Sequence, residues 1–232
     1  MKKRIKKILS AASICMLCCS CISTAQSRKH HLLSGYDNEI KGYNQEALAE
    51  YKKAVEKEPD NDTAWTNLGN VYSKTGEKDK AIEAYKKAIS INEKYPEAMN
   101  NLACIYIDNK ENLDEAINLS EKSISLNPES IWCYYDTLGW AYFKKAEHEK
   151  ALENINKAIS LCPQTENEFL ATAHYHSALI QFESGNKEDA LNHYDKALRL
   201  SNDSTLKSII EMNVKLLTRK PNKGGNDEKT NP

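Results

Sequence analysis

The chain has little glycine and little proline, 8 and 6 of its 232 residues. This scarcity excludes collagen-like chains and Gly/Pro-rich low-complexity chains. An excess of basic residues is also missing, since 32 Lys and Arg stand against 33 Asp and Glu. The first 25 residues hold five basic residues and no acid, which leaves 27 basic and 33 acidic residues and a net charge of −6 in the remainder. An acidic body argues against nucleic-acid binding, which needs a basic face.

The N-terminus has the three-part pattern of a secretory signal. A cationic segment, 1–7, precedes an apolar run from Ile8 to Ile22, and small residues follow. The run is shorter than the ~20 residues that a permanent membrane-spanning helix needs. Residues 1–25 are therefore predicted to be a signal peptide, and the body is expected to be exported to the cell envelope.

Two processing events fit this leader. Cleavage after Ala25 would follow the small residues that signal peptidase prefers and release a periplasmic protein. Alternatively, Cys21 after Ser20 resembles the lipobox of bacterial lipoproteins, although Cys18 stands where that pattern usually has leucine. Lipidation at Cys21 would tether the protein to a membrane, so a periplasmic and a membrane-anchored location both remain open.

Residues that could carry catalysis or bind a metal are sparse and scattered. Three cysteines lie outside the leader, Cys104, Cys133 and Cys162, and this odd number implies no disulfide framework. No Gly-rich phosphate loop, Gly-x-Ser-x-Gly elbow or His-Glu-x-x-His motif occurs. His174, His176 and His193 fall close together in the fifth repeat, and His174, at the position that Trp65 holds in the second, is interpreted as packing between helices. No enzymatic activity, cofactor or metal is expected.

An internal repeat of about 34 residues runs through the body and decides the fold class. The segment Trp65-Thr-Asn-Leu-Gly-Asn-Val-Tyr72 is followed by Ala81, Tyr85 and Ala88, and related patterns recur before and after it. This pattern resembles the tetratricopeptide repeat (TPR) family. The resemblance implies an all-α, right-handed solenoid of five helix-pair repeats plus a C-terminal capping helix. The predicted repeats are 28–61, 62–95, 96–130, 132–165 and 171–204.

Small residues have defined roles in this arrangement. Gly69 and Gly139 fall at position 8 of their repeats, where a second helix must approach closely. Gly42, Gly76 and Gly185 are expected to end first helices in the left-handed conformation.

The ends of the array and one insertion depart from the pattern. Residues 205–219 are predicted to form the capping helix, which covers the last apolar face, and the polar tail 220–232 is predicted to be disordered. Five extra residues, 166–170, should lengthen the first helix of the fifth repeat, with Thr165 and Glu168 forming a capping box.

By the family resemblance, the inner face of the solenoid binds a protein or peptide, mainly through first-helix positions 2, 5, 6, 9, 12 and 13. The predicted lining is Thr66, Asn67, Asn70, Asn100, Asn101, Asp136, Trp140, Phe143, Tyr175, Leu179 and Phe182. The asparagines could read a peptide backbone, or they could be family consensus only. Phe143 and Phe182 fit either the groove or the core. Trp140 is expected to anchor the partner, because binding energy concentrates in aromatic residues, and to contribute little to stability.

The sequence thus predicts a non-catalytic scaffold or adaptor of the bacterial cell envelope. The alternative is an accessory, chaperone-like subunit that presents a substrate protein to a separate enzyme or assembly machine. No nucleic acid is expected as a partner.

Overall fold

The computed structural model describes residues 30–126, 129 and 131–219. These residues are helical, with short turns and no β-strand among them. The leader predicted over 1–25, with Cys21, and the tail predicted over 220–232 lie outside the described residues. Within the described part of the chain, no helix is both long and apolar enough to cross a bilayer.

The chain divides after Glu129 into two compact units, here called unit 1 and unit 2. Unit 1 begins with a helix over 30–40, the N-terminal helix. Its further helices are α2 (Asn44–Lys57), α3 (Asp62–Lys74), α4 (Lys78–Ile91), α5 (Pro96–Asn109) and α6 (Leu113–Leu126). Unit 2 contains α7 (Ile131–Lys144), α8 (His148–Leu161), α9 (Asn167–Glu183), α10 (Lys187–Leu200) and α11 (Ser204–Thr218).

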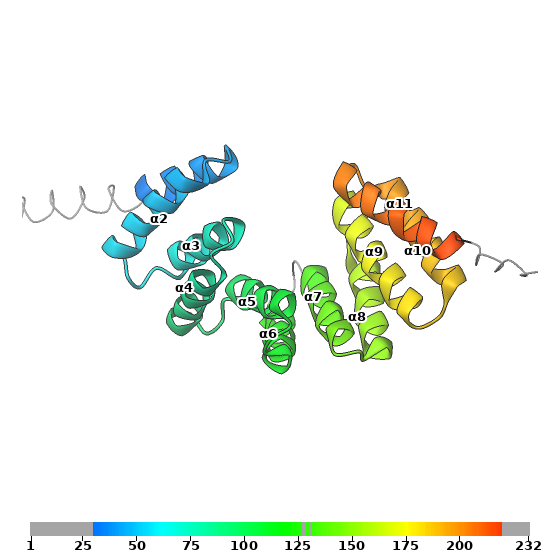
Figure 1. The fold of residues 1–232 in the computed structure, drawn as a ribbon. Helices are drawn as coiled ribbons and strands as arrows, with labels where there is room; N and C mark the ends of the chain where they lie inside the picture. The colour runs from blue at the N-terminus through cyan, green and yellow to red at the C-terminus, as the bar shows by residue number, and fades with distance from the viewer. Residues whose placement is uncertain (1–29, 127–128, 130, 220–232) are drawn as a thin grey trace, which may run out of the picture. The chain divides into compact units, whose positions relative to one another are not determined.

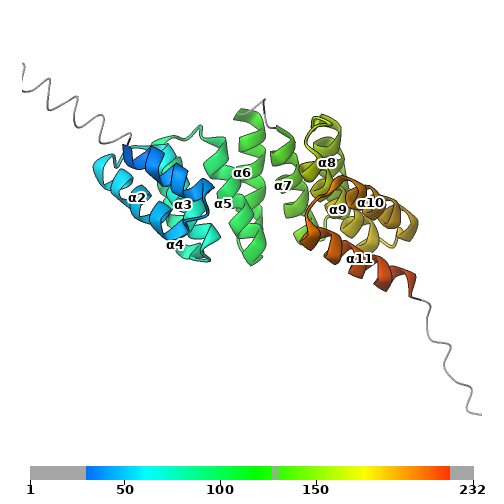
Figure 2. The same ribbon diagram turned by 90° about the horizontal axis from the view of Figure 1, so that it is seen from above.

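In each unit, helices that follow one another in the chain pack as pairs, and the pairs stack on one another (Figures 1 and 2). The closest packing joins α3 to α4, α5 to α6, α7 to α8 and α9 to α10. This is the all-α helix-pair architecture that the repeat predicts. The capping helix predicted over 205–219 is α11, which packs on α10.

Close approach within a pair depends on the small residue at position 8. A Cβ atom added to Gly69 would lie 2.6 Å from Cε1 of Tyr85, and one added to Gly139 would lie 2.8 Å from Cδ1 of Ile155. Because real Cβ atoms are not found this close to other carbons, both positions require glycine at the observed spacing. The expected role of these glycines is confirmed.

The turns after first helices use the left-handed conformation. Gly42, Gly76 and Gly185 have φ values of 78°, 82° and 84°, as the sequence predicts. The third and fourth repeats lack a glycine there, and Lys110 and Ala146 adopt the same region, with φ of 56° and 59°.

The insertion before the fifth repeat lengthens α9 to 17 residues, as expected. The predicted capping box is wrong, because the N-cap residue is Glu166 and its side chain makes no cap hydrogen bond. The Glu168 carboxylate instead accepts hydrogen bonds from Ser201 Oγ, at 2.9 Å, and from the backbone N–H of Asn202, at 2.5 Å. These bonds lower the pKa of Glu168. Glu168 therefore fixes the start of α9 to the connection between α10 and α11.

Candidate interaction site

Unit 1 carries a hydrogen-bonded cluster between α3 and α5. The Oδ1 atom of Asn70 accepts one bond from the Tyr85 hydroxyl, at 2.7 Å, and a second from Asn101 Nδ2, at 2.9 Å. Burial raises the pKa of Tyr85, so its hydroxyl remains a donor. The cluster leaves Asn70 Nδ2 and Asn101 Oδ1 without a partner among the described residues. The site therefore offers three amide N–H donors, two on Asn70 and one on Asn101, and the carbonyl acceptor of Asn101.

These side chains border an open pocket of about 320 Å³. Its lining is Asn70, Ser73, Lys74, Tyr85, Asn101, Cys104, Ile105 and Asp108. The sequence prediction included only two of these residues, Asn70 and Asn101. Ser73, Lys74 and Asp108 occupy positions 12, 13 and 13 of their repeats, so applying the family's inner-face positions fully would have found them.

An apolar stripe on the N-terminal helix belongs to the same unit. Leu33, Tyr36 and Ile40 occupy positions 6, 9 and 13, and more than half of each residue is exposed. The Glu39 carboxylate, which accepts a hydrogen bond from the Tyr51 hydroxyl at 3.0 Å, forms an ion pair with Lys74 of α3. The stripe was missed because the first repeat departs from the consensus pattern.

Three predicted polar residues of unit 1 behave differently from one another. Thr66 is only 3% exposed, and its hydroxyl donates to the Asp62 carbonyl oxygen, at 2.9 Å. Its assignment to the binding surface is therefore wrong, because a threonine in a helix can satisfy its hydroxyl on the preceding turn. Asn100 Nδ2 points to Cys104 Sγ, at 3.9 Å, and its Oδ1 is buried without a partner in the described structure. Asn67 is half-buried.

In unit 2 the corresponding face is closed by its own contacts. The Asp136 carboxylate lies 3.0 Å from His176 Nδ1, and the His176 ring stacks on Trp140 with centroids 4.2 Å apart and an interplanar angle of 19°. Lys144 Nζ lies 4.3 Å from the Trp140 ring centroid. The ring centroids of Trp140 and Phe143 are 4.8 Å apart. An ammonium and a stacked ring this close cannot share one face of the indole. Both faces of Trp140 are therefore occupied.

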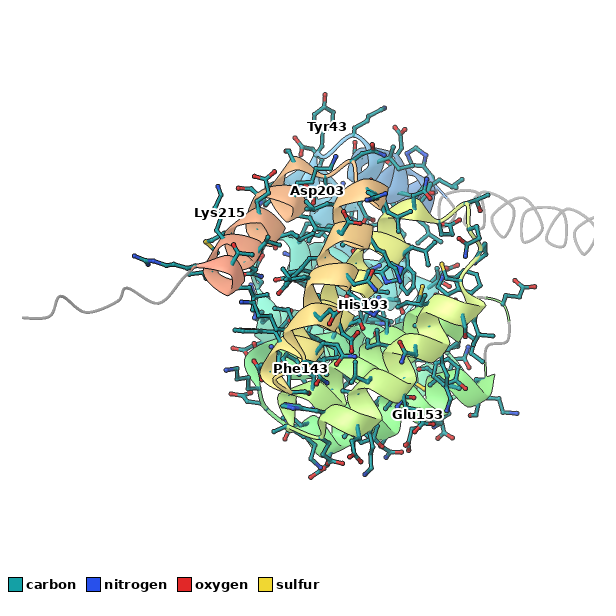
Figure 3. The ribbon with its side chains drawn as sticks, turned by 90° about the vertical axis from the view of Figure 1, so that its right-hand side faces the viewer. Tyr43, Phe143, Glu153, His193, Asp203 and Lys215 are labelled. Atoms are coloured by element: carbon teal, nitrogen blue, oxygen red, sulfur yellow. The ribbon has the colours of Figure 1, made fainter. Side chains whose placement is uncertain are left out.

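The other predicted aromatic and aliphatic residues of unit 2 divide between core and surface. Phe143 is buried with Ala151, Ile155 and Ile180, so its place is the core (Figure 3). Tyr175 and Leu179 are half-buried and pack on the cluster around Tyr194. Phe182 is 47% exposed. Asp136 is buried and engaged by His176, which removes it from the expected lining, so Phe182 is the most exposed predicted residue of this face.

A pair of histidines joins α9 to α10. His174 Nδ1 lies 3.0 Å from His193 Nδ1, and His193 Nε2 lies 3.4 Å from Ser177 Oγ. Burial, with smaller contributions from His193 and Lys196, lowers the pKa of His174 to about 4. Burial and Lys196 also lower the pKa of His193. Among the described residues, no group of three or more His, Cys, Asp and Glu side chains is placed to hold a metal ion.

Known proteins share this architecture. The chain is 32% identical over 185 residues to a TPR repeat-containing protein of Methanocaldococcus jannaschii, covering 71% of this chain and 31% of that protein. It is 35% identical over 75 residues to the photosystem I assembly protein Ycf3 of Rippkaea orientalis, covering 31% and 43%. The chain thus spans less than half the length of either relative.

A solved structure of a thermophilic TPR protein from Thermus thermophilus superposes with a TM-score of 0.67, at 20% identity, over 81% of this chain and 98% of that one. At this identity the likeness shows the fold. Models of the tetratricopeptide repeat match residues 63–95, 84–118, 134–165 and 171–204, and a TPR repeat model matches 40–76. Because these matches together cover 40–118, 134–165 and 171–204, more than half of the chain, it belongs to the tetratricopeptide repeat family.

Proposed function

We propose that this protein is a non-catalytic scaffold of the bacterial cell envelope that binds an extended segment of a partner protein on the inner face of unit 1. Proteins of this family mediate protein–protein interactions. The pocket between α3 and α5 carries the proposal, because the unpartnered amide atoms of Asn70 and Asn101 border open space there.

The available atoms match the needs of a peptide backbone. Asn70 Nδ2 can donate to a backbone carbonyl, and Asn101 Oδ1 can accept from a backbone N–H. The bond between the two asparagines holds both amides in place, which lowers the entropy lost on binding. The stripe of Leu33, Tyr36 and Ile40 would take apolar side chains of the same segment.

A photo-crosslinking amino acid at Tyr36, introduced in the cells of origin, tests this placement. We expect it to capture one partner, whereas the same group at Lys87, which is exposed on α4, should not. Purified protein should then bind the captured segment, and Leu33→Ser/Ile40→Ser should weaken binding at least tenfold without lowering the melting temperature. Asn101→Ala should cost about 1 kcal/mol, roughly fivefold in Kd. Equal capture at both positions would contradict the proposal.

The cell-envelope location is proposed from the leader alone. The mass of the mature protein distinguishes the two processing events, since a lipid-modified Cys21 and an unmodified N-terminus at Gln26 differ in both mass and sequence. Intact Met1 in cytoplasmic protein would exclude both.

A chaperone-like accessory subunit is the second candidate, and the likeness to Ycf3, which is named as an assembly protein, favours it. A stable one-to-one complex in analytical ultracentrifugation supports the scaffold. Weak binding to many unfolded chains, with suppression of their aggregation, supports the accessory subunit.

A further inference from the structure

The capping helix α11 has two chemically different faces. Ile210 and Leu217 are buried in the cluster with Tyr194 of α10. On a different side of the helix, Ile209, Met212 and Leu216 are 38%, 56% and 62% exposed. Their spacing of three and four residues places them on one stripe of the helix. In Figures 1 and 2, α11 lies at the edge of unit 2. The exposure of the three side chains shows that this stripe is open to solvent.

If α11 were the first helix of a sixth repeat, the second helix of that repeat would not fit on this stripe. If the repeat register continues, Met212 takes position 8, which Gly69 and Gly139 hold in their repeats. At Gly69 even a single added carbon would lie 2.6 Å from the helix that packs there. A long methionine side chain at this position therefore blocks the close approach by which every complete repeat covers its first helix.

Cationic side chains border the same stripe. At 100° per residue, Lys215 lies about 60° from Met212 around the helix, and Arg219 is the C-cap residue directly after the last turn. Both are exposed, and neither forms an ion pair with another described residue. Figure 3 shows Lys215 directed away from the body of unit 2. The exposed face thus combines flexible apolar side chains with positive charge, the pattern of helices that lie in a membrane interface.

We propose that this face of α11 docks on an anionic lipid surface. Ile209, Met212 and Leu216 would enter the boundary between headgroups and acyl chains, and Lys215 and Arg219 would pair with lipid phosphates. The soft lipid surface accommodates the methionine that excludes a packed helix. With three apolar residues and two cations, binding should be weak and reversible, and it would orient unit 2 at a membrane that the protein reaches by other means.

Vesicle flotation tests the proposal on the chain from Gln26, one of the two expected mature forms. The leader is left out because its apolar run would bind vesicles by itself. We expect binding to vesicles containing 30% phosphatidylglycerol in phosphatidylcholine, a loss of binding on pure phosphatidylcholine, and weaker binding at high salt.

Two variants separate the contributions of the face, and a third is the matched control. Met212→Ser/Leu216→Ser should lower the partition coefficient at least tenfold, and Lys215→Glu/Arg219→Glu should abolish the preference for anionic vesicles. Leu33→Ser/Ile40→Ser removes a similarly exposed apolar pair bordered by Asp37 and Glu39, and it should leave vesicle binding unchanged. The same control variant should weaken peptide binding at least tenfold, so failure of the lipid proposal and failure of the proposed function are distinguishable.

Equal partitioning of Met212→Ser/Leu216→Ser and the unchanged protein, with both melting at the same temperature, would overturn the proposal. Equal binding to neutral and anionic vesicles would also overturn it. The alternative occupant of this face is a second copy of the chain, and sedimentation velocity tests it. A concentration-dependent dimer that Met212→Ser/Leu216→Ser converts to monomer, together with no vesicle binding, would assign the face to dimerisation instead.

Discussion

Replacing Gly69 with alanine tests the link between helix packing and the pocket. The new Cβ atom would lie 2.6 Å from Cε1 and 2.8 Å from Cδ1 of Tyr85, so one of the two helices must move by about 1 Å. Tyr85 cannot rotate away cheaply, because it is only 2% exposed and its hydroxyl is held by Asn70. Overpacking of this kind costs about 2 kcal/mol. The same movement should pull Tyr85 from Asn70 and disturb the pocket.

Urea unfolding of Gly69→Ala gives the cost, and Gly76→Ala is the control. Gly76 has open space around its Cα but a φ of 82°, so its replacement should cost about 1 kcal/mol through backbone strain alone. Adding Tyr85→Leu to Gly69→Ala should restore part of the loss, because the shorter side chain makes room for the methyl group, whereas it should not rescue Gly76→Ala. A Gly69→Ala variant as stable as the unchanged protein would refute the steric argument.

The remaining predictions concern unit 2 and one comparison between units. Trp140→Ala should destabilise by about 2–3 kcal/mol in thermal or urea unfolding, because both faces of the ring are packed. Tyr85→Phe should cost about 1 kcal/mol, whereas Tyr194→Phe should be nearly neutral in the same assay, because the Tyr194 hydroxyl is buried without a hydrogen-bond partner in the described structure. The pKa of His174, about 4 in the fold, lies below its ordinary value of 6.5, so stability should fall as pH drops from about 6.5 to about 4. After allowance for solvent screening, the free energy of unfolding should fall by about 1–2 kcal/mol over this range. Urea unfolding at the two pH values should show a smaller fall for His174→Gln than for the unchanged protein.

The repeat register predicts the fold because each signature residue has a local mechanical role. The spacing of apolar residues fixes which side of a helix is buried, and glycine at position 8 fixes how closely the second helix approaches. Two repeats have no glycine at the turn after the first helix, and there Lys110 and Ala146 adopt the left-handed conformation instead. Backbone geometry at a turn is imposed by the helices on both sides, so the residue identity there can vary.

The candidate site was predicted less well, because register gives the direction of a side chain but not its neighbour. Trp140 was expected on the inner side of α7, and nothing in the repeat pattern indicates that His176, 36 residues later, covers one of its faces. Register also does not show which hydrogen bond a polar side chain makes. The Thr66 hydroxyl donates to the Asp62 carbonyl of its own helix, so it is not available to a ligand. Contacts between repeats depend on the size and shape of both partners, which a one-dimensional pattern does not contain.

Both units use the same pair of register positions for contact between neighbouring first helices. Position 9 of one repeat meets position 6 of the next, as Asn70 meets Asn101 in unit 1 and Trp140 meets His176 in unit 2. In unit 1 the pair consists of two amides, which satisfy each other only in part and leave donors and an acceptor for a ligand. In unit 2 it consists of two stacked rings, and Asp136 and Lys144 complete their contacts. The recognition chemistry therefore changes through two residues per repeat, while the backbone arrangement remains the same. This difference between the two pairs is why the peptide site is proposed for unit 1.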